Sequence, residues 1–278
     1  MTNVLGFRVW GARGSLPRLS RGQVAHGGNT VCLEVLHPGK EWIVLDAGTG
    51  IANLGDHILK QGSSRKIHLF LSHYHWDHVM GLPFFGPIYR KGFTINLYGL
   101  LSDEGHINEM LDVVFSPLYS PIYSPDNLLG SLSIPKASEH REVDGVTIRT
   151  FELNDVHPGG YMVIRVESAS GCFVYASDVE LRDPHVKASL MACLRGADLF
   201  LCDATFGQER FETAVGWGHS SIEAAFEVAK QVGVKRLMGI HYDPLRTDAD
   251  LDETCERLNR QGKGPVVTTL IEGDTVWL

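Results

Sequence analysis

The stretch Ser72-His73-Tyr74-His75-Trp76-Asp77-His78 crowds three histidines and one aspartate together. It follows the apolar run 67–71, which has the composition of a buried strand, so these side chains emerge where a turn can aim them into one cavity. Imidazoles and a carboxylate are ligands that zinc and similar metals accept, and a catalytic metal site leaves one position for water. The stretch therefore predicts a metal site at the end of a strand.

Outward from this stretch, short apolar or β-branched runs predict a chain rich in strands. The predicted strands cover residues 7–10, 30–36, 42–46, 67–72, 94–98, 146–152, 162–167, 173–177, 199–203 and 236–241. Helical periodicity is clearest in 221–232, where Ile222, Ala225, Phe226 and Ala229 share one face. Weaker helices are predicted at 51–61, 102–115, 185–195 and 250–261. This order of elements predicts mixed sheets covered by helices.

The chain has no Pro-, Gly- or Ser-rich linker long enough to separate two domains, so residues 1–278 are predicted to form one domain. Residues 115–133 are irregular and carry Pro117, Pro121 and Pro125 among aromatic residues. A long loop of this kind is often a functional lid, and exposed aromatic side chains suit a lid or a dimer contact. We therefore predict such a segment at about 103–133; the alternative is a loop packed on its own domain.

The composition, 44% hydrophobic and 21% charged, is that of an ordinary globular protein. The formal net charge of −8 argues against a large nucleic-acid surface, because binding a long polyanion depends on clustered Lys and Arg. A small anion needs only a local patch. Four arginines precede Glu34, the first acidic residue, and either bind a small anion or are solvated loop residues: Arg8, Arg13, Arg18 and Arg21.

Residues 1–8 lack the basic segment and apolar run of a secretory signal, and no apolar stretch approaches membrane-spanning length. We therefore expect a cytoplasmic protein that does not enter a membrane. The five cysteines are scattered and form no Cys-x-x-Cys pair, so neither a disulfide framework nor a thiolate zinc site is predicted. They are expected to be small core residues: Cys32, Cys172, Cys193, Cys202 and Cys255.

The pattern His-x-His-x-Asp-His after a strand resembles the signature of the metallo-β-lactamase superfamily. The resemblance implies an α+β fold, a four-layer αββα sandwich of two mixed sheets flanked by helices. It also implies that Asp46, in an Asp-x-Gly turn, supports the metal loop rather than binding metal. The implied ligands are His73, His75 and His157 for one metal, Asp77, His78 and His241 for the other, and Asp178 as the bridge.

Two metal ions that share a water lower the pKa of that water and hold the attacking and leaving oxygens of a displacement. The resemblance implies that the bridging hydroxide is the nucleophile and that Asp77 helps to orient it. Two divalent ions per chain are therefore expected. Zn²⁺ is the first choice, with Mn²⁺ and iron as alternatives, because histidine and carboxylate ligands suit all three.

Four further motifs resemble the ribonuclease Z-like branch, which cleaves phosphodiesters: residues 10–15, 26–30, 203–206 and 216–221. In that branch an acidic residue pairs with a histidine that faces the scissile phosphate. The pair here would be Asp203 and His219, with aspartate where glutamate is common. Because such a carboxylate fixes the tautomer and favours the protonated ring, His219 is the predicted general acid. Its alternative role is a loop residue before a helix.

The predicted substrate is a small phosphodiester, since the sequence lacks a basic, glycine-rich arm for transfer RNA. The opening motif, 10–15, resembles bacterial and phage phosphodiesterases that act on cyclic nucleotides, so 3′,5′-cyclic nucleotides are the first candidates. Arg13 is predicted to bind substrate, while Tyr119 and Tyr123 would stack on a base, across a homodimer. His26, beside two glycines, could also approach the substrate.

Three alternatives stay open. A lactonase or β-lactamase would use the same metals, but the pair of Asp203 and His219 would then lack an evident purpose. A phosphodiesterase that acts on another cyclic phosphate, or on RNA ends, would use closely similar chemistry. A nucleotide-binding protein without activity would be expected to have lost a metal ligand, and the sequence retains a candidate for each.

Overall fold

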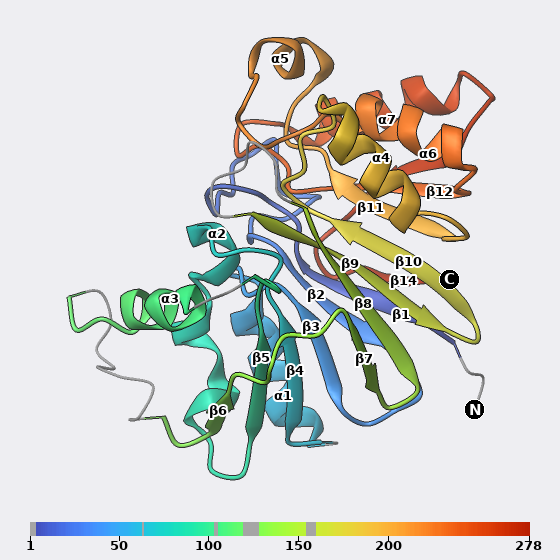
Figure 1. Ribbon diagram of the computed structural model, residues 1–278. Coiled ribbons are helices and arrows are strands. Elements are labelled where there is room, and N and C mark those ends of the chain that lie inside the picture. The colour runs from blue at the N-terminus through green and yellow to red at the C-terminus, as the bar shows by residue number, and fades with distance from the viewer. Residues whose placement is uncertain (1–3, 63, 103–104, 119–127, 154–159) are drawn as a thin grey trace.

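Two seven-stranded sheets lie face to face, with helices on both outer faces (Figure 1). The computed structural model describes residues 4–62, 64–102, 105–118, 128–153 and 160–278. The first sheet has the order β14 (Thr275–Trp277), β1 (Gly6–Gly11), β2 (Cys32–Leu36), β3 (Trp42–Leu45), β4 (Lys66–Phe70), β5 (Thr94–Tyr98) and β6 (Ser131–Ser133). The second has the order β13 (Val266–Thr269), β12 (Arg236–Ile240), β11 (Leu199–Asp203), β10 (Gly171–Ala176), β9 (Tyr161–Ser168), β8 (Val146–Leu153) and β7 (His140–Val143).

The helices complete the outer layers of this sandwich. On the side of the first sheet lie α1 (Ile51–Gln61), α2 (Trp76–Val79) and α3 (His106–Val114). The short 3-10 helices η1 (Leu82–Phe84) and η2 (Gly86–Tyr89) contact α1. On the side of the second lie α4 (Pro184–Cys193), α6 (Ile222–Val232) and α7 (Asp248–Asn259), while α5 (Gln208–Thr213) stands at the top of Figure 1. The predicted four-layer α+β sandwich is confirmed.

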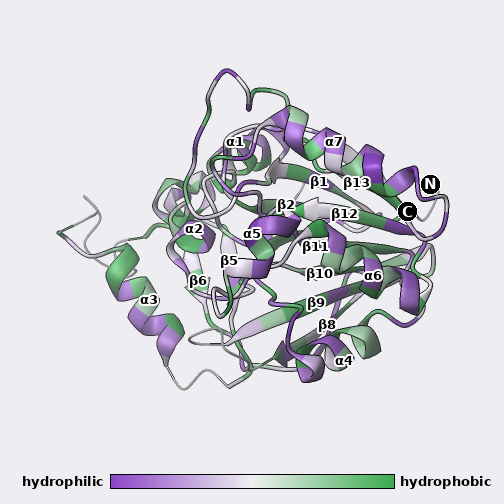
Figure 2. Ribbon diagram, turned by 90° about the horizontal axis from the view of Figure 1, so that it is seen from above, coloured by the Kyte–Doolittle hydropathy of each residue, from purple (hydrophilic) through white to green (hydrophobic). Residues whose placement is uncertain are grey.

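Side chains of β3 alternate between two buried layers. Ile43 and Leu45 point toward the second sheet, whereas Val44 packs with Leu54 and Ile58 of α1. Successive side chains of a strand point to opposite faces, so a strand buried on both faces appears in the sequence as an unbroken apolar run. Figure 2 shows both hydrophilic and hydrophobic residues along α3 and α7, as expected for helices with one buried side.

Parallel pairing brings the ends of several strands to one edge of the sandwich. β3, β4 and β5 run parallel in the first sheet, and β10, β11 and β12 run parallel in the second. Across the sheets, the hydroxyl of Tyr175 in β10 donates a hydrogen bond to the carboxylate of Asp46, which follows β3. The loops that carry the sequence motifs therefore leave the two sheets close together.

All ten predicted strands are present, with ends shifted by a residue or two. The unpredicted strands β6, β7, β13 and β14 are short and largely exposed, so their sequences show little apolar patterning. The face predicted for 221–232 is buried in α6. The predicted helix 102–115 begins later, at His106, and the predicted helices 185–195 and 250–261 begin earlier, where Asp183 and Thr247 cap α4 and α7.

Two other sequence predictions are only partly covered by the structure. In the segment 103–133, residues 103–104 and 119–127 lie outside the described residues, and the described remainder includes α3 and β6. Its role as a lid or dimer contact, and the single domain, remain predictions.

Within the described ranges, no helix is long and apolar enough to cross a membrane. All five cysteines are buried, as predicted for core residues.

The core between the sheets gives a direct test of the fold. Phe173 is fully buried, 5.3 Å from the ring of Phe7 on the opposite sheet, whereas Phe84 is 72% exposed. Phe173→Ala is expected to lower the free energy of unfolding by about 3–5 kcal/mol, because it removes buried apolar surface and leaves a cavity. Phe84→Ala, the matched control, should change it by about 0.5 kcal/mol or less. Urea denaturation measures both, and equal losses would contradict this packing.

Candidate metal centre

Three residues that follow strands have left-handed backbone conformations. Asp46 after β3 has φ 60°, Asp178 after β10 has φ 55°, and His241 after β12 has φ 62°. Non-glycine residues rarely adopt such angles, which cost of the order of 1–3 kcal/mol each and persist where the surroundings hold them. All three side chains are buried. Their shared strain marks this edge of the sandwich as the candidate functional site.

Asp77, His78 and His241 form one cluster, in which the candidate ligand atoms all lie within 4.8 Å of one another. Nε2 of His241 lies 2.9 Å from Oδ2 of Asp77. Nε2 of His78 is buried and makes no well-aligned hydrogen bond among the described residues, although Oδ2 of Asp178 is 3.1 Å away. A buried imidazole nitrogen that faces two carboxylates fits a metal ligand.

His73, His75 and Asp178 form the second cluster. Nε2 of His73 lies 3.7 Å from Oδ1 of Asp178, while Oδ2 of Asp178 faces His78 and His241. Burial by itself favours the neutral carboxyl group, but the facing histidines hold the pKa of Asp178 well below its usual range. One anionic carboxylate thus presents an oxygen to each cluster. The donor set of imidazoles and carboxylates fits two divalent ions.

The carboxylate of Asp46 lies behind these clusters and orients the metal loop. It accepts hydrogen bonds from the backbone N–H of Ser72 at 2.6 Å, from the hydroxyl of Ser72 at 2.8 Å and from Nδ1 of His78 at 2.9 Å. Because Nδ1 of His78 carries the donated proton, Nε2 is left as a lone-pair donor toward the cluster. The structure thus places Asp46 where the resemblance implied a supporting residue.

The opening motif, 10–15, packs its backbone against the site. A Cβ at Gly14 would lie 2.2 Å from ring atoms of His241, so only glycine allows this approach. The next residue, Ser15, has φ 61° and donates its backbone N–H to Oδ2 of Asp77 at 2.7 Å. The hydroxyl of Thr30 donates to the backbone carbonyl of Asp77 at 2.7 Å. Sequence reasoning missed these roles, although it singled out both motifs.

The substrate contact predicted for Arg13 is wrong. Its side chain is fully buried and donates hydrogen bonds to the carbonyls of Gly27 at 3.0 Å and Arg246 at 2.8 Å. His26 is also buried, with Nδ1 2.9 Å from Asp248 and Nε2 2.8 Å from the hydroxyl of Thr269. Both side chains fasten the N-terminal loops to the loop and helix that follow β12. An arginine beside a motif cannot be assigned to substrate until its burial is known.

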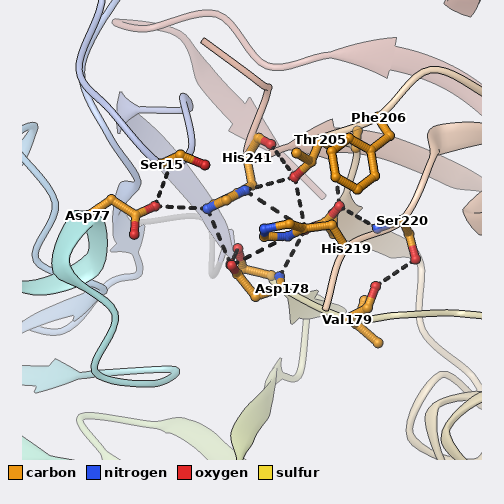
Figure 3. Close-up of polar contacts among 12 residues, drawn as sticks. Ser15, Asp77, Asp178, Val179, Thr205, Phe206, His219, Ser220 and His241 are labelled. Atoms are coloured by element: carbon orange, nitrogen blue, oxygen red, sulfur yellow. Dashed lines mark hydrogen bonds and ion pairs between the residues drawn. The ribbon is translucent and has the colours of Figure 1, made fainter. Parts of the chain in front are cut away.

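His219 lies beside Asp178 and His241, which belong to the second and the first cluster respectively (Figure 3). Its Nδ1 is 3.0 Å from Oδ2 of Asp203 and 3.5 Å from Oδ1 of Asp178, and its ring stacks on that of His241 at 5.0 Å. Asp203 also accepts hydrogen bonds from backbone N–H groups of three neighbouring loop residues. Burial by itself lowers the pKa of His219, but the charge of Asp203 raises it to about 9. The structure brings the predicted pair together.

The loop that carries His219 is held by Glu180, which sequence reasoning did not identify. The buried carboxylate of Glu180 accepts hydrogen bonds from the backbone N–H groups of Gly216 and Gly218, both at 3.0 Å. These glycines have φ 78° and 77°, a conformation that favours glycine. Only the Gly-x-Gly spacing could have signalled this turn, and nothing in the sequence linked it to an acidic residue on another loop.

Three predicted site residues lie outside the described residues: His157, Tyr119 and Tyr123. The metal-binding role of His157 and the base-stacking roles of the two tyrosines therefore remain predictions. The other predicted ligands gather at one edge of the sandwich, where they follow β4, β10 and β12. The pair of Asp203 and His219 adds the end of β11 and the loop after it, so four separate loops contribute to the site. Such convergence is typical of a catalytic centre.

The fold and this centre define a metal-dependent hydrolase of the metallo-β-lactamase kind. The chain belongs to the beta-lactamase superfamily: the family described as the beta-lactamase superfamily domain matches residues 41–242, from just before β3 to just after His241. The membership predicted from the metal loop is confirmed. The relatives support the ribonuclease Z-like branch.

Among these relatives, a ribonuclease Z from Parabacteroides distasonis is 25% identical over 240 residues, which cover 67% of this chain and 77% of that protein. Across the ribonuclease Z relatives, the matched share of the relative's own length runs from 24% to 92%. Two solved structures share the fold: the metallo-beta-lactamase fold protein YhfI from Bacillus subtilis and a diphosphatase from the PhnP family. YhfI has a TM-score of 0.71 and 19% identity, and the match covers 100% of both chains. The diphosphatase has a TM-score of 0.68 and 17% identity, and the match covers 98% of this chain and 96% of that chain.

Metal content tests the centre directly. Because one carboxylate contacts both clusters, Asp178→Asn is expected to lower the metal content from about two ions per chain to less than about one. The matched control is Asp243→Asn, two residues after His241, whose carboxylate caps a turn at the backbone N–H of Leu245. It should keep the wild-type content. Elemental analysis measures all three proteins, and an unchanged content in Asp178→Asn would contradict the shared ligand.

Proposed function

We propose that this chain hydrolyses phosphodiester bonds with two divalent metal ions. The proposal rests on the position of Asp178, whose oxygens face both ligand clusters while His219 lies 3.5 Å from the same carboxylate. Two metal ions, when bound, supply positive charge and a water of lowered pKa for hydrolysis. The residues that would hold them are His73, His75, Asp77, His78, His157, Asp178 and His241, with Zn²⁺ as the proposed metal and Mn²⁺ as the alternative.

We assign to His219 the transfer of a proton to the leaving oxygen. Its Nδ1 N–H donates to Asp203, which fixes the orientation of the ring and leaves Nε2 as the nitrogen that delivers the proton. Asp203 is itself fully buried and held by backbone N–H groups, so it stays aimed at the ring. Asp77, which accepts the N–H of Ser15, is proposed to orient the attacking water.

A phosphodiester fits this centre better than a neutral ring does. A lactone or β-lactam also expels a group that needs a proton, but it lacks the phosphoryl charge that a protonated His219, held by Asp203, can stabilise. The relatives named ribonuclease Z and the structural neighbour named a diphosphatase both point to phosphorus–oxygen bonds. A protonated imidazole beside the scissile group stabilises phosphoryl charge as well as the leaving oxygen.

Within this class we propose 3′,5′-cyclic nucleotides as the first substrates to test. The net charge of −8 supports a small substrate over a long polyanion. RNA ends are the second candidate, which the name of the ribonuclease Z relatives favours. We further propose a homodimer in which the segment 103–133 contributes to the contact, and a cytoplasmic location.

The role of His219 predicts a dependence on the leaving group. His219→Ala is expected to lower kcat for 3′,5′-cyclic AMP by about 10²–10⁴-fold, because the leaving sugar oxygen needs a proton. The loss should be much smaller for bis(p-nitrophenyl) phosphate, whose leaving group is stable as an anion. Steady-state kinetics at equal metal content, with the exposed His140→Ala as control, measures this. Equal losses on both substrates would assign His219 another role.

A substrate panel tests the proposed reaction. Wild-type protein loaded with Zn²⁺ or Mn²⁺ should cleave 3′,5′-cyclic AMP or GMP, should lose that activity after treatment with a chelator, and should recover it when the metal is restored. The same panel contains an RNA with a 3′ extension and a simple lactone. Faster cleavage of the RNA would select the second candidate. Hydrolysis of the lactone without cleavage of any diester would refute the phosphodiesterase proposal.

A further inference from the structure

An exposed tryptophan lies two residues before His219. Trp217 is 63% exposed, on the loop that Glu180 holds through two glycine N–H groups. Its ring lies 6.5 Å from that of Phe206, which in turn meets the ring of His219 edge-on at 5.6 Å. Because Phe206 is only 2% exposed, these three rings form a packed series from the metal centre to the surface. Single exposed apolar side chains are common, so the residues around Trp217 must show whether it binds a ligand.

Those neighbours are polar and come from α5. The guanidinium of Arg210 lies 5.3 Å from the ring centre of Phe206 and 5.9 Å from that of Trp217. No carboxylate within the described ranges forms an ion pair with it. Trp217 and Arg210 line an open depression of about 490 Å³ together with Glu209 and Thr213. An aromatic face, an arginine and a carboxylate thus stand together, with the ring of Phe206 between them and the proposed general acid.

We propose that this depression is a nucleobase subsite, in which Trp217 stacks on the base of the substrate. The proposal rests on the phosphodiesterase function and deepens it, since it makes the substrate a nucleotide. Every base has a flat π-face that stacks on an aromatic side chain. The donors of Arg210 match acceptor atoms on a base edge, and the carboxylate of Glu209 accepts from the N–H groups of a base.

This chemistry favours a nucleotide over a protein partner. Val215 on the same loop is 66% exposed, so an apolar protein contact is the competing occupant. Such a contact would desolvate Arg210, Glu209 and Thr213 without an evident partner for each. A nucleotide instead uses all three kinds of group, and its phosphate lies only a few ångströms from its base. The ring of Phe206 lies between the subsite and the proposed general acid, 6.5 Å from the ring of Trp217 and 5.6 Å from that of His219.

The test compares two esters with the same leaving group. Thymidine 5′-(p-nitrophenyl) phosphate carries a base, whereas methyl p-nitrophenyl phosphate has no aromatic ring besides the leaving group. In Trp217→Ala, the ratio of kcat/KM for the first ester to that for the second is expected to fall by about 5- to 100-fold. Trp217→Phe should retain most of the ratio, because it keeps an aromatic face. Trp277→Ala removes a tryptophan that is 51% exposed on β14 and serves as the matched control.

A second measurement separates this proposal from the reaction itself. Calorimetry compares binding of GMP and of inorganic phosphate to the wild-type protein and to Trp217→Ala, without any turnover. Weaker GMP binding in the variant, with phosphate binding retained, supports the subsite. If the protein also cleaves no diester, the proposed reaction is refuted but the subsite is still supported. Cleavage of both esters at a ratio that Trp217→Ala leaves unchanged overturns the subsite alone. An unchanged ratio with an altered oligomeric mass would assign Trp217 to a protein contact.

Discussion

The buried carboxylate of Asp46 links the two sheets to the metal loop, and the geometry of the site follows from that link. Asp46 comes after β3 in the first sheet, accepts three hydrogen bonds from the metal loop after β4, and accepts the hydroxyl of Tyr175 from the second sheet. A fully buried anion is tolerated only where such donors surround it. One group therefore couples the closure of the sandwich to the orientation of His78.

Around this group, backbone rather than side chains does much of the positioning. The N–H of Ser15 holds Asp77, the N–H groups of three loop residues hold Asp203, and Glu180 holds the loop of His219. Backbone donors cannot change rotamer, so they fix a carboxylate more rigidly than a flexible side chain does. The left-handed backbone conformations of Asp46, Asp178 and His241 also depend on their surroundings, because the surrounding packing must hold these residues in a strained conformation.

Much of the fold could be predicted because its strands are buried on both faces. β3 and the first four residues of β11 appear in the sequence as continuous apolar runs, and each run ends just before a residue of the site. The short strands β6 and β14 could not be found in this way. Their residues are largely exposed, and they are strands only because a neighbour supplies hydrogen-bond partners.

A metal site could be predicted from the sequence because the chemistry of metal binding restricts the residue types in 72–78, and the superfamily and the remaining candidate ligands were implied by the resemblance of that pattern to a known signature. The roles of the surrounding motifs became clear only in the folded chain. Arg13 looked like a substrate contact but is buried against carbonyl groups, while its neighbours Gly14 and Ser15 position His241 and Asp77. Ligand type can be read from a side chain's chemistry, whereas burial and backbone hydrogen bonds depend on segments far apart in the sequence that meet only when the chain folds.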